Sequence, residues 1–81
     1  MMVSILFFSS LRDYVGVKSL EMEIPVETTV ALLKEKLARE YRPLSSFMGS
    51  VMTAINGEYA SDDQVIAPDA EIAFFPPVSG G

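Results

Sequence analysis

The sequence predicts an α+β fold in which one mixed sheet of about five strands curls over one main helix. Strand-forming runs lie at both ends of the chain, and one amphipathic helical stretch lies in the middle. Hydrophobic residues make up 49% of the 81 residues, which is enough for a packed core and argues against disorder. We expect a single domain over residues 1–75 and an extended tail over residues 76–81.

The first third of the chain predicts a hairpin. Residues 3–8 are apolar and rich in strand formers, and residues 9–16 read as a turn or one helical turn closed by a glycine. Residues 18–24 alternate with the period of a strand that has one wet face. Pro25 should end this second strand, because proline cannot donate to the ladder.

A helix is predicted after the hairpin. The hydroxyl of Thr28 or Thr29 is well placed to cap its first turn, and Pro43 should stop it. Apolar residues at spacings of three and four form a stripe that should pack on the sheet: Val30, Leu33, Leu37 and Tyr41. The basic side chains of this segment are expected on the exposed side of the helix: Lys34, Lys36 and Arg39.

The last third of the chain predicts three more strands. Residues 51–55 form a strand that leads into Asn56-Gly57, a strong tight-turn signal because both residues tolerate φ > 0. A short return strand should include Tyr59, and residues 71–75 form the final strand.

Strand alternation separates the two faces of the predicted sheet. If Phe74 points toward the helix, Phe75 must point away, and the same alternation with Phe7 inward leaves Phe8 on the outer face. Tyr59 joins them if the register permits. An exposed cluster of these aromatic residues would form a docking patch, since monomers seldom display large apolar surfaces without a use. The alternative is partial burial under a loop.

The composition argues against several function classes. The chain has no cysteine and no histidine, so it lacks a thiol nucleophile and the usual neutral-pH base. A net charge of −5 removes the main electrostatic contribution to nucleic acid binding and favours a basic protein partner. Neither a signal peptide nor a membrane span is visible, and we therefore expect a cytoplasmic protein that binds no membrane.

We expect no metal site in this chain. Asp62 and Asp63, with Asp69 and Glu71 nearby, have no histidine and no EF-hand pattern around them, so they are interpreted as solvated loop charges. Glu21 and Glu23 share one strand face and are interpreted as wet surface rather than as a catalytic pair.

The tail is the most informative part of the sequence. Pro76 and Pro77 preset φ near about −65° and lower the entropy cost of docking an extended segment. The six residues of the tail reach roughly 20 Å beyond the last strand. Gly80 and Gly81 lack Cβ atoms and therefore fit a narrow channel, which leaves the terminal carboxylate unobstructed. A frayed end or a cloning scar are the alternatives.

Three groups of residues resemble a known family: Phe7-Phe8, the run at residues 54–56, and above all FFPPVSGG at residues 74–81. They are similar to the small subunit of molybdopterin synthase, a MoaD-type sulfur carrier of the ubiquitin-like β-grasp family. The resemblance covers the whole chain and implies a β-grasp fold. It also implies a sulfur carrier for molybdenum cofactor biosynthesis.

By this resemblance, the terminal residues carry the chemistry and partner proteins supply the catalytic groups. Gly81 would be adenylated by an ATP-dependent, E1-like activating enzyme and converted to a thiocarboxylate by a sulfur donor protein, with Gly80 as its slender neighbour. The tail would then enter the large subunit of the synthase, in a heterotetramer of two small and two large subunits, where its sulfur attacks a cyclic pyranopterin monophosphate. No cofactor is expected on this chain itself. The expected partner-binding residues are Phe8, Tyr59, Phe75, Pro76, Pro77, Val78 and Ser79, although an aliphatic residue is more usual at the position of Tyr59.

Two other functions remain open at this point. A sulfur carrier of thiazole biosynthesis is one, but those chains are usually shorter and lack the Phe-Phe-Pro-Pro lead-in. A ubiquitin-like modifier joined through Gly81 to target lysines is the other, and it starts from the same adenylated end.

Overall fold

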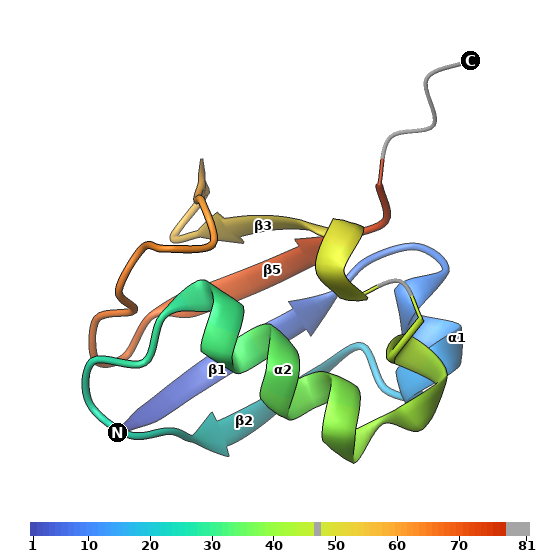
Figure 1. Cartoon of the computed structure of the whole chain (residues 1–81), viewed down its shortest axis with the longest axis horizontal. Coiled ribbons are helices and arrows are strands. Elements are labelled where there is room, and N and C mark those ends of the chain that lie inside the picture. Colours follow the sequence, from blue (N-terminus) through green and yellow to red (C-terminus); the bar gives the residue numbers. More distant parts are fainter. Residues whose placement is uncertain (47, 78–81) are drawn as a thin grey trace.

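The computed structural model describes residues 1–46 and 48–77 and shows a five-stranded sheet with one long helix packed on one face (Figure 1). The strands are β1 Met2–Phe7, β2 Ser19–Glu23, β3 Met52–Ile55, β4 Glu58–Tyr59 and β5 Glu71–Phe75. The α-helices are α1 Leu11–Val15 and α2 Val30–Glu40, and two 3₁₀ turns follow, η1 Arg42–Leu44 and η2 Met48–Ser50. The predicted α+β fold with one main helix is confirmed.

The sheet has the strand order β2-β1-β5-β3-β4. The first and last strands, β1 and β5, lie side by side and run parallel, whereas all the other pairs are antiparallel. The predicted hairpin of β1 and β2 is confirmed. Because β5 pairs with both β1 and β3, it is a central strand, and the tail leaves the domain from the middle of the sheet.

One residue caps the C-terminal end of α1, and another caps the N-terminal end of α2. Gly16 ends α1 in the left-handed region, with φ of 91°, and its amide donates to the Arg12 carbonyl over 2.7 Å. At the start of α2 the Thr29 hydroxyl accepts a hydrogen bond from the Leu32 amide at 3.2 Å, so Thr29 is the cap. The Thr28 hydroxyl instead donates to the Pro25 carbonyl over 2.6 Å.

The core lies between α2 and the inner face of the sheet. The apolar stripe of α2 supplies three fully buried residues, Val30, Leu33 and Leu37. Opposite them, the inward residues of the central strands are buried as alternation predicts: Val3, Ile5, Phe7, Ile72 and Phe74. The rings of Phe7 and Phe74 stack with centroids 6.2 Å apart, so the two central strands also meet through their side chains.

Lys34 is not on the exposed side of α2, and that expectation was wrong. The residue is only 7% exposed, and its ammonium group donates to the Val51 carbonyl at 3.0 Å and to a carboxylate oxygen of Asp62 at 2.8 Å. Lys34 follows Leu33 and lies one turn after Val30, so it borders the buried stripe and extends its aliphatic stem along the core. Asp62 is correspondingly an ion-pair partner, although 58% of its side chain stays exposed.

We expect Lys34→Met to lower the free energy of unfolding by about 1–3 kcal/mol, because the buried Val51 carbonyl loses its charged donor. The matched control is Lys36→Met, which removes the same charge from the same helix. Lys36 forms only an exposed pair with Glu40 at 3.4 Å, and its loss should cost less than about 0.5 kcal/mol. Urea denaturation measures the free energy of unfolding of both variants. Equal decreases would contradict a stabilising role for the hydrogen bonds of Lys34.

Candidate docking face and C-terminal arm

The outer face of the sheet carries aromatic residues at the end from which the tail departs. Phe8 and Phe75 stack there with ring centroids 4.8 Å apart and an interplanar angle of 13°. Phe8 is 36% exposed and Phe75 is half-buried. Their position follows from the parallel register, which pairs Phe7 with Phe74 on the inner side and so leaves the next residue of each strand outside.

A hollow of about 290 Å³ lies on this face beside the stacked rings. Side chains from β1, β3, β4, β5 and the turn between β3 and β4 line it: Leu6, Phe8, Ala54, Gly57, Tyr59, Glu71, Ala73 and Phe75. The floor is low because small residues, Ala54 and Ala73, lie opposite each other in the β3–β5 register. We call this set the docking face.

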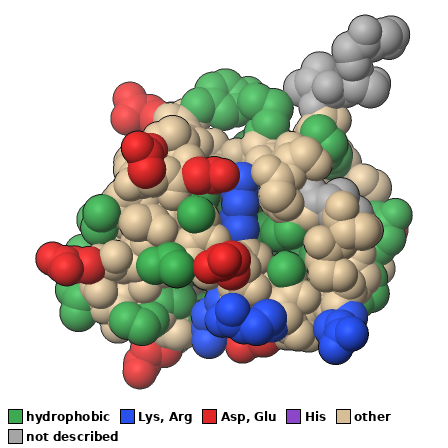
Figure 2. All heavy atoms as spheres, viewed as in Figure 1, with side chains coloured by type: hydrophobic (Ala, Val, Ile, Leu, Met, Phe, Trp, Pro, Cys, Tyr) green, Lys and Arg blue, Asp and Glu red, His purple; other side chains and the backbone are tan. Residues whose placement is uncertain are grey.

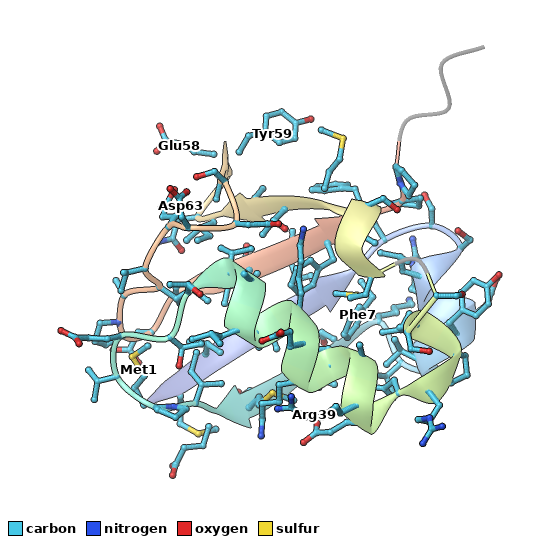
Figure 3. All side chains as sticks on the ribbon, in the orientation of Figure 1. Met1, Phe7, Arg39, Glu58, Tyr59 and Asp63 are labelled. Atoms are coloured by element: carbon cyan, nitrogen blue, oxygen red, sulfur yellow. The ribbon has the colours of Figure 1, made fainter. Side chains whose placement is uncertain are left out.

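Tyr59 forms the far wall of the docking face. It pairs with Ala54 in the β3–β4 register, is 76% exposed, and projects from the edge of the sheet, as Figure 3 shows. The structure therefore brings Phe8, Tyr59 and Phe75 around one hollow, with Phe8 and Tyr59 exposed and Phe75 half-buried. Their role in partner binding stays a prediction.

The arm, residues 76–81, begins directly after Phe75. Pro76 is half-buried and Pro77 is exposed. The predicted site residues Val78, Ser79, Gly80 and Gly81 lie outside the described residues. A hydrogen bond from the Phe8 amide to the Phe74 carbonyl, at 3.1 Å, ties the base of the arm to the end of β1. The docking face and the start of the arm are thus adjacent.

Sequence reasoning missed part of the docking face. Ala54 and Gly57 line the hollow, yet they were interpreted only as a strand residue and a turn residue. The available signal was the presence of small residues at outward positions beside large ones, since a hollow needs small floor residues between larger walls. Glu71 also reaches the rim, where it adds one carboxylate to an otherwise apolar set.

The helix side of the molecule carries charged residues. Figure 2 shows this side, where Asp, Glu, Lys and Arg side chains are spread among the hydrophobic ones. Arg39 extends from the exposed side of α2, as expected (Figure 3). The hollow of the docking face lies on the other side of the sheet, next to the described start of the arm.

No group of three or more Asp or Glu side chains within residues 1–46 and 48–77 is placed to hold a metal ion. The pKa of Asp63 is lowered from its ordinary value by a hydrogen bond from the Ser61 hydroxyl, 2.5 Å long, in an exposed loop far along the chain from the arm. Within the same described ranges, no helix is long and apolar enough to cross a membrane.

Comparison with known protein families decides the affiliation of the chain. The ThiS family matches residues 5–81, which is nearly the whole sequence. The chain belongs to the ThiS family. The resemblance stated from residues 7–8, 54–56 and 74–81 is confirmed at this level.

Two relatives that match this chain over nearly its whole length carry the same name. The molybdopterin synthase sulfur carrier subunit of Dictyostelium discoideum is 39% identical, with 95% of this chain and 93% of the relative covered. The protein of the same name from Escherichia coli K12 is 35% identical, with 99% of this chain and 100% of the relative covered.

Solved structures confirm the β-grasp fold expected for a ThiS family member. SAMP1 from Haloferax volcanii is 26% identical with a TM-score of 0.84, and all of both chains is covered. A ubiquitin from Caldiarchaeum subterraneum is 17% identical with a TM-score of 0.69, covering 100% of this chain and 98% of that one. The second likeness concerns the fold alone.

Phe74 and Phe75 should differ sharply in their contribution to stability. We expect Phe74→Ala to lower the free energy of unfolding by about 3–5 kcal/mol, because Phe74 is fully buried and its removal leaves a cavity. Phe75→Ala should cost only about 1–2 kcal/mol, since it removes a half-exposed stack with Phe8. Thermal and urea unfolding check the pair, and a larger loss for Phe75→Ala would contradict the assignment of the two faces.

Proposed function

We propose that this chain is the sulfur-carrier small subunit of molybdopterin synthase, acting through Gly81 in molybdenum cofactor biosynthesis. The observation that carries the proposal is its end-to-end match to sulfur carrier subunits of that synthase, at 35% identity over 99% of this chain for the Escherichia coli relative. The FFPPVSGG ending at residues 74–81 and the apolar docking face beside it support the same function.

The chemistry begins with activation of the Gly81 carboxylate. A carboxylate is anionic at neutral pH and is a poor electrophile toward sulfur. In the proposed cycle, one of its oxygens attacks the α-phosphate of ATP on an E1-like adenylating enzyme, and pyrophosphate leaves. The outer sulfur of a persulfide on a sulfur donor protein then attacks the acyl carbon and displaces AMP, which gives an acyl disulfide. A second thiol, supplied by a partner protein, attacks the donor's sulfur, forms a disulfide with it and releases Gly81 as a thiocarboxylate. None of these steps requires a side chain of this protein.

The second half of the cycle takes place in the large subunit. The thiocarboxylate sulfur would attack a cyclic pyranopterin monophosphate, and two such transfers would build the dithiolene. Gly80 and Gly81 suit a narrow channel because they lack side chains. The general bases and oxyanion donors would come from the large subunit, which fits a chain without histidine or cysteine.

The docking face is the proposed handle for these partners. Exposed aromatic residues around a hollow are typical anchors of protein interfaces. Phe8 and Phe75 lie at the base of the arm, and Tyr59 forms the far wall. With the arm extended, Gly81 would sit roughly 20 Å beyond β5. A partner that grips the docking face would therefore receive the terminus inside its own active site, with Pro76, Pro77, Val78 and Ser79 in contact along the way.

The proposed assembly is a heterotetramer of two small and two large subunits in the cytoplasm. A second candidate function, a ubiquitin-like modifier, is favoured by the likeness to SAMP1, a small archaeal modifier protein, at 26% identity over all of both chains. A thiazole-pathway sulfur carrier is a third candidate function, because the family model that matches this chain is the ThiS family. These candidates share the adenylation step and differ in the acceptor that receives Gly81 or its sulfur.

Incubation with an E1-like adenylating enzyme, ATP and a sulfur source should replace one oxygen of the Gly81 carboxylate by sulfur. Intact-mass spectrometry measures the exchange, and fragmentation of the C-terminal peptide locates it. Deletion of Gly81 should abolish the exchange without lowering the melting temperature, because the packed core is formed by residues that precede the arm. Loading of the Escherichia coli relative, but not of this chain, under the same conditions would sink the proposal.

Binding to the large subunit of molybdopterin synthase gives a separate measurement. We expect Tyr59→Ala and Phe75→Ala each to weaken that binding by about tenfold or more, since anchor residues of an interface typically contribute that much. Glu35→Ala, an exposed change on the helix side, serves as the control and should have no effect. Recovery of Gly81 in isopeptide bonds to many cellular lysines would instead favour the modifier function.

A further inference from the structure

Asn56 is bonded twice to the first residue of β5. Its backbone amide donates to the Glu71 carbonyl at 2.8 Å, and its side-chain oxygen accepts from the Glu71 amide at 2.9 Å. Glu71 lies 15 residues further along the chain, so this pair of hydrogen bonds joins the β3–β4 turn to the sheet. We call it the Asn56 clasp.

The clasp has a clear structural cause. The ladder between β3 and β5 ends with Ile55 opposite Ile72, and the chain then turns away at Asn56, where φ is 50°. In a continued ladder, the backbone carbonyl of Asn56 would accept from the Glu71 amide, but the turn points that carbonyl elsewhere. The side-chain oxygen of Asn56 accepts this hydrogen bond instead. Asparagine also tolerates the left-handed φ that the turn requires.

The clasp lies at the root of the segment that carries Tyr59. Strand β4 has only two residues and pairs with β3 alone, as the edge of the sheet. It is held by its pairing with Ala54 and Ile55 and by a hydrogen bond from the Ala60 amide to the Thr53 carbonyl, at 2.9 Å. A segment this short has few contacts of its own to fix its angle to the sheet. The turn that precedes it must supply that constraint.

We propose that Asn56 is a positioning residue of the docking face, which holds the Tyr59 wall at a fixed place over the hollow. The inference rests on the proposed function, because it assigns Asn56 a part in binding the synthase large subunit. Asn56 acts through Tyr59, the wall residue that follows it in β4. Glu71, at the other end of the clasp, lines the same hollow.

Two substitutions at Asn56 distinguish the effect of the side-chain hydrogen bond from that of the turn's backbone conformation. Asn56→Gly keeps the freedom to adopt positive φ but removes the side-chain oxygen. Asn56→Asp keeps an oxygen acceptor and a residue type found at positive φ, and serves as the conservative rescue. The matched control is Asp69→Gly, which makes the same change to glycine at another positive-φ residue, with φ of 62°, outside the docking face.

Affinity for the large subunit, measured at about 0.15 M salt to screen the added charge of the Asp variant, gives the first readout. We expect Asn56→Gly to weaken binding by about 5- to 10-fold, while Asn56→Asp and Asp69→Gly stay within about 2-fold of the wild type. In a Tyr59→Ala background, Asn56→Gly should change the affinity by less than about 2-fold. A purely structural role would not produce this coupling.

Amide hydrogen exchange of the free protein gives the second readout and needs no partner. Asn56→Gly should speed exchange at the Glu71 and Ala60 amides, whereas Asp69→Gly should leave both unchanged. An equal loss of affinity with and without Tyr59, or unchanged exchange at Ala60, would overturn the positioning role. A wild-type chain that binds no large subunit would overturn the proposed function instead, and the exchange data would still decide whether Asn56 positions β4.

Discussion

The parallel pairing of β1 with β5 is the contact on which the rest of the molecule depends. It joins the first and last strands in the centre of the sheet, in a register that sets Phe7 beside Phe74. Every neighbouring feature follows from that register. The inward pair completes the core under α2, and the next residues, Phe8 and Phe75, meet on the outer face. A shift by one residue would exchange the two sets and remove both the core and the docking face.

The two faces of the sheet have different tasks. The inner face is filled by large residues that pack on α2, and beside it the buried Lys34 ammonium donates two hydrogen bonds, to the Val51 carbonyl and to the Asp62 carboxylate. The outer face combines small floor residues with aromatic walls and is left uncovered by the rest of the described chain. Stability therefore resides on one face, and the other is free to be shaped for binding.

Most of the fold could be predicted because the period of two in the strands and the spacing of three and four in the helix report burial directly. The aromatic residues of the docking face could be predicted for the same reason, as alternation places Phe8 and Phe75 outward. The positions of Lys34 and Asn56 could not. Lys34 is held by oxygens of Val51 and Asp62, and Asn56 is held by the amide of Glu71. These partners are distant in sequence, and no local pattern predicts them.

The same pairing also bears on how the proposed sulfur carrier would meet its partners. Because β1 and β5 are the two ends of the chain, their contact closes nearly the whole sequence into one loop, and the arm is placed only when the domain has folded. The Phe8–Phe75 stack ends directly before Pro76, so an extended arm would hold Gly81 roughly 20 Å from the docking face. An activating enzyme and a synthase could then bind the same face and meet the terminus at the same depth. One surface and one arm length would suffice for both partners, and the two would bind in turn rather than together.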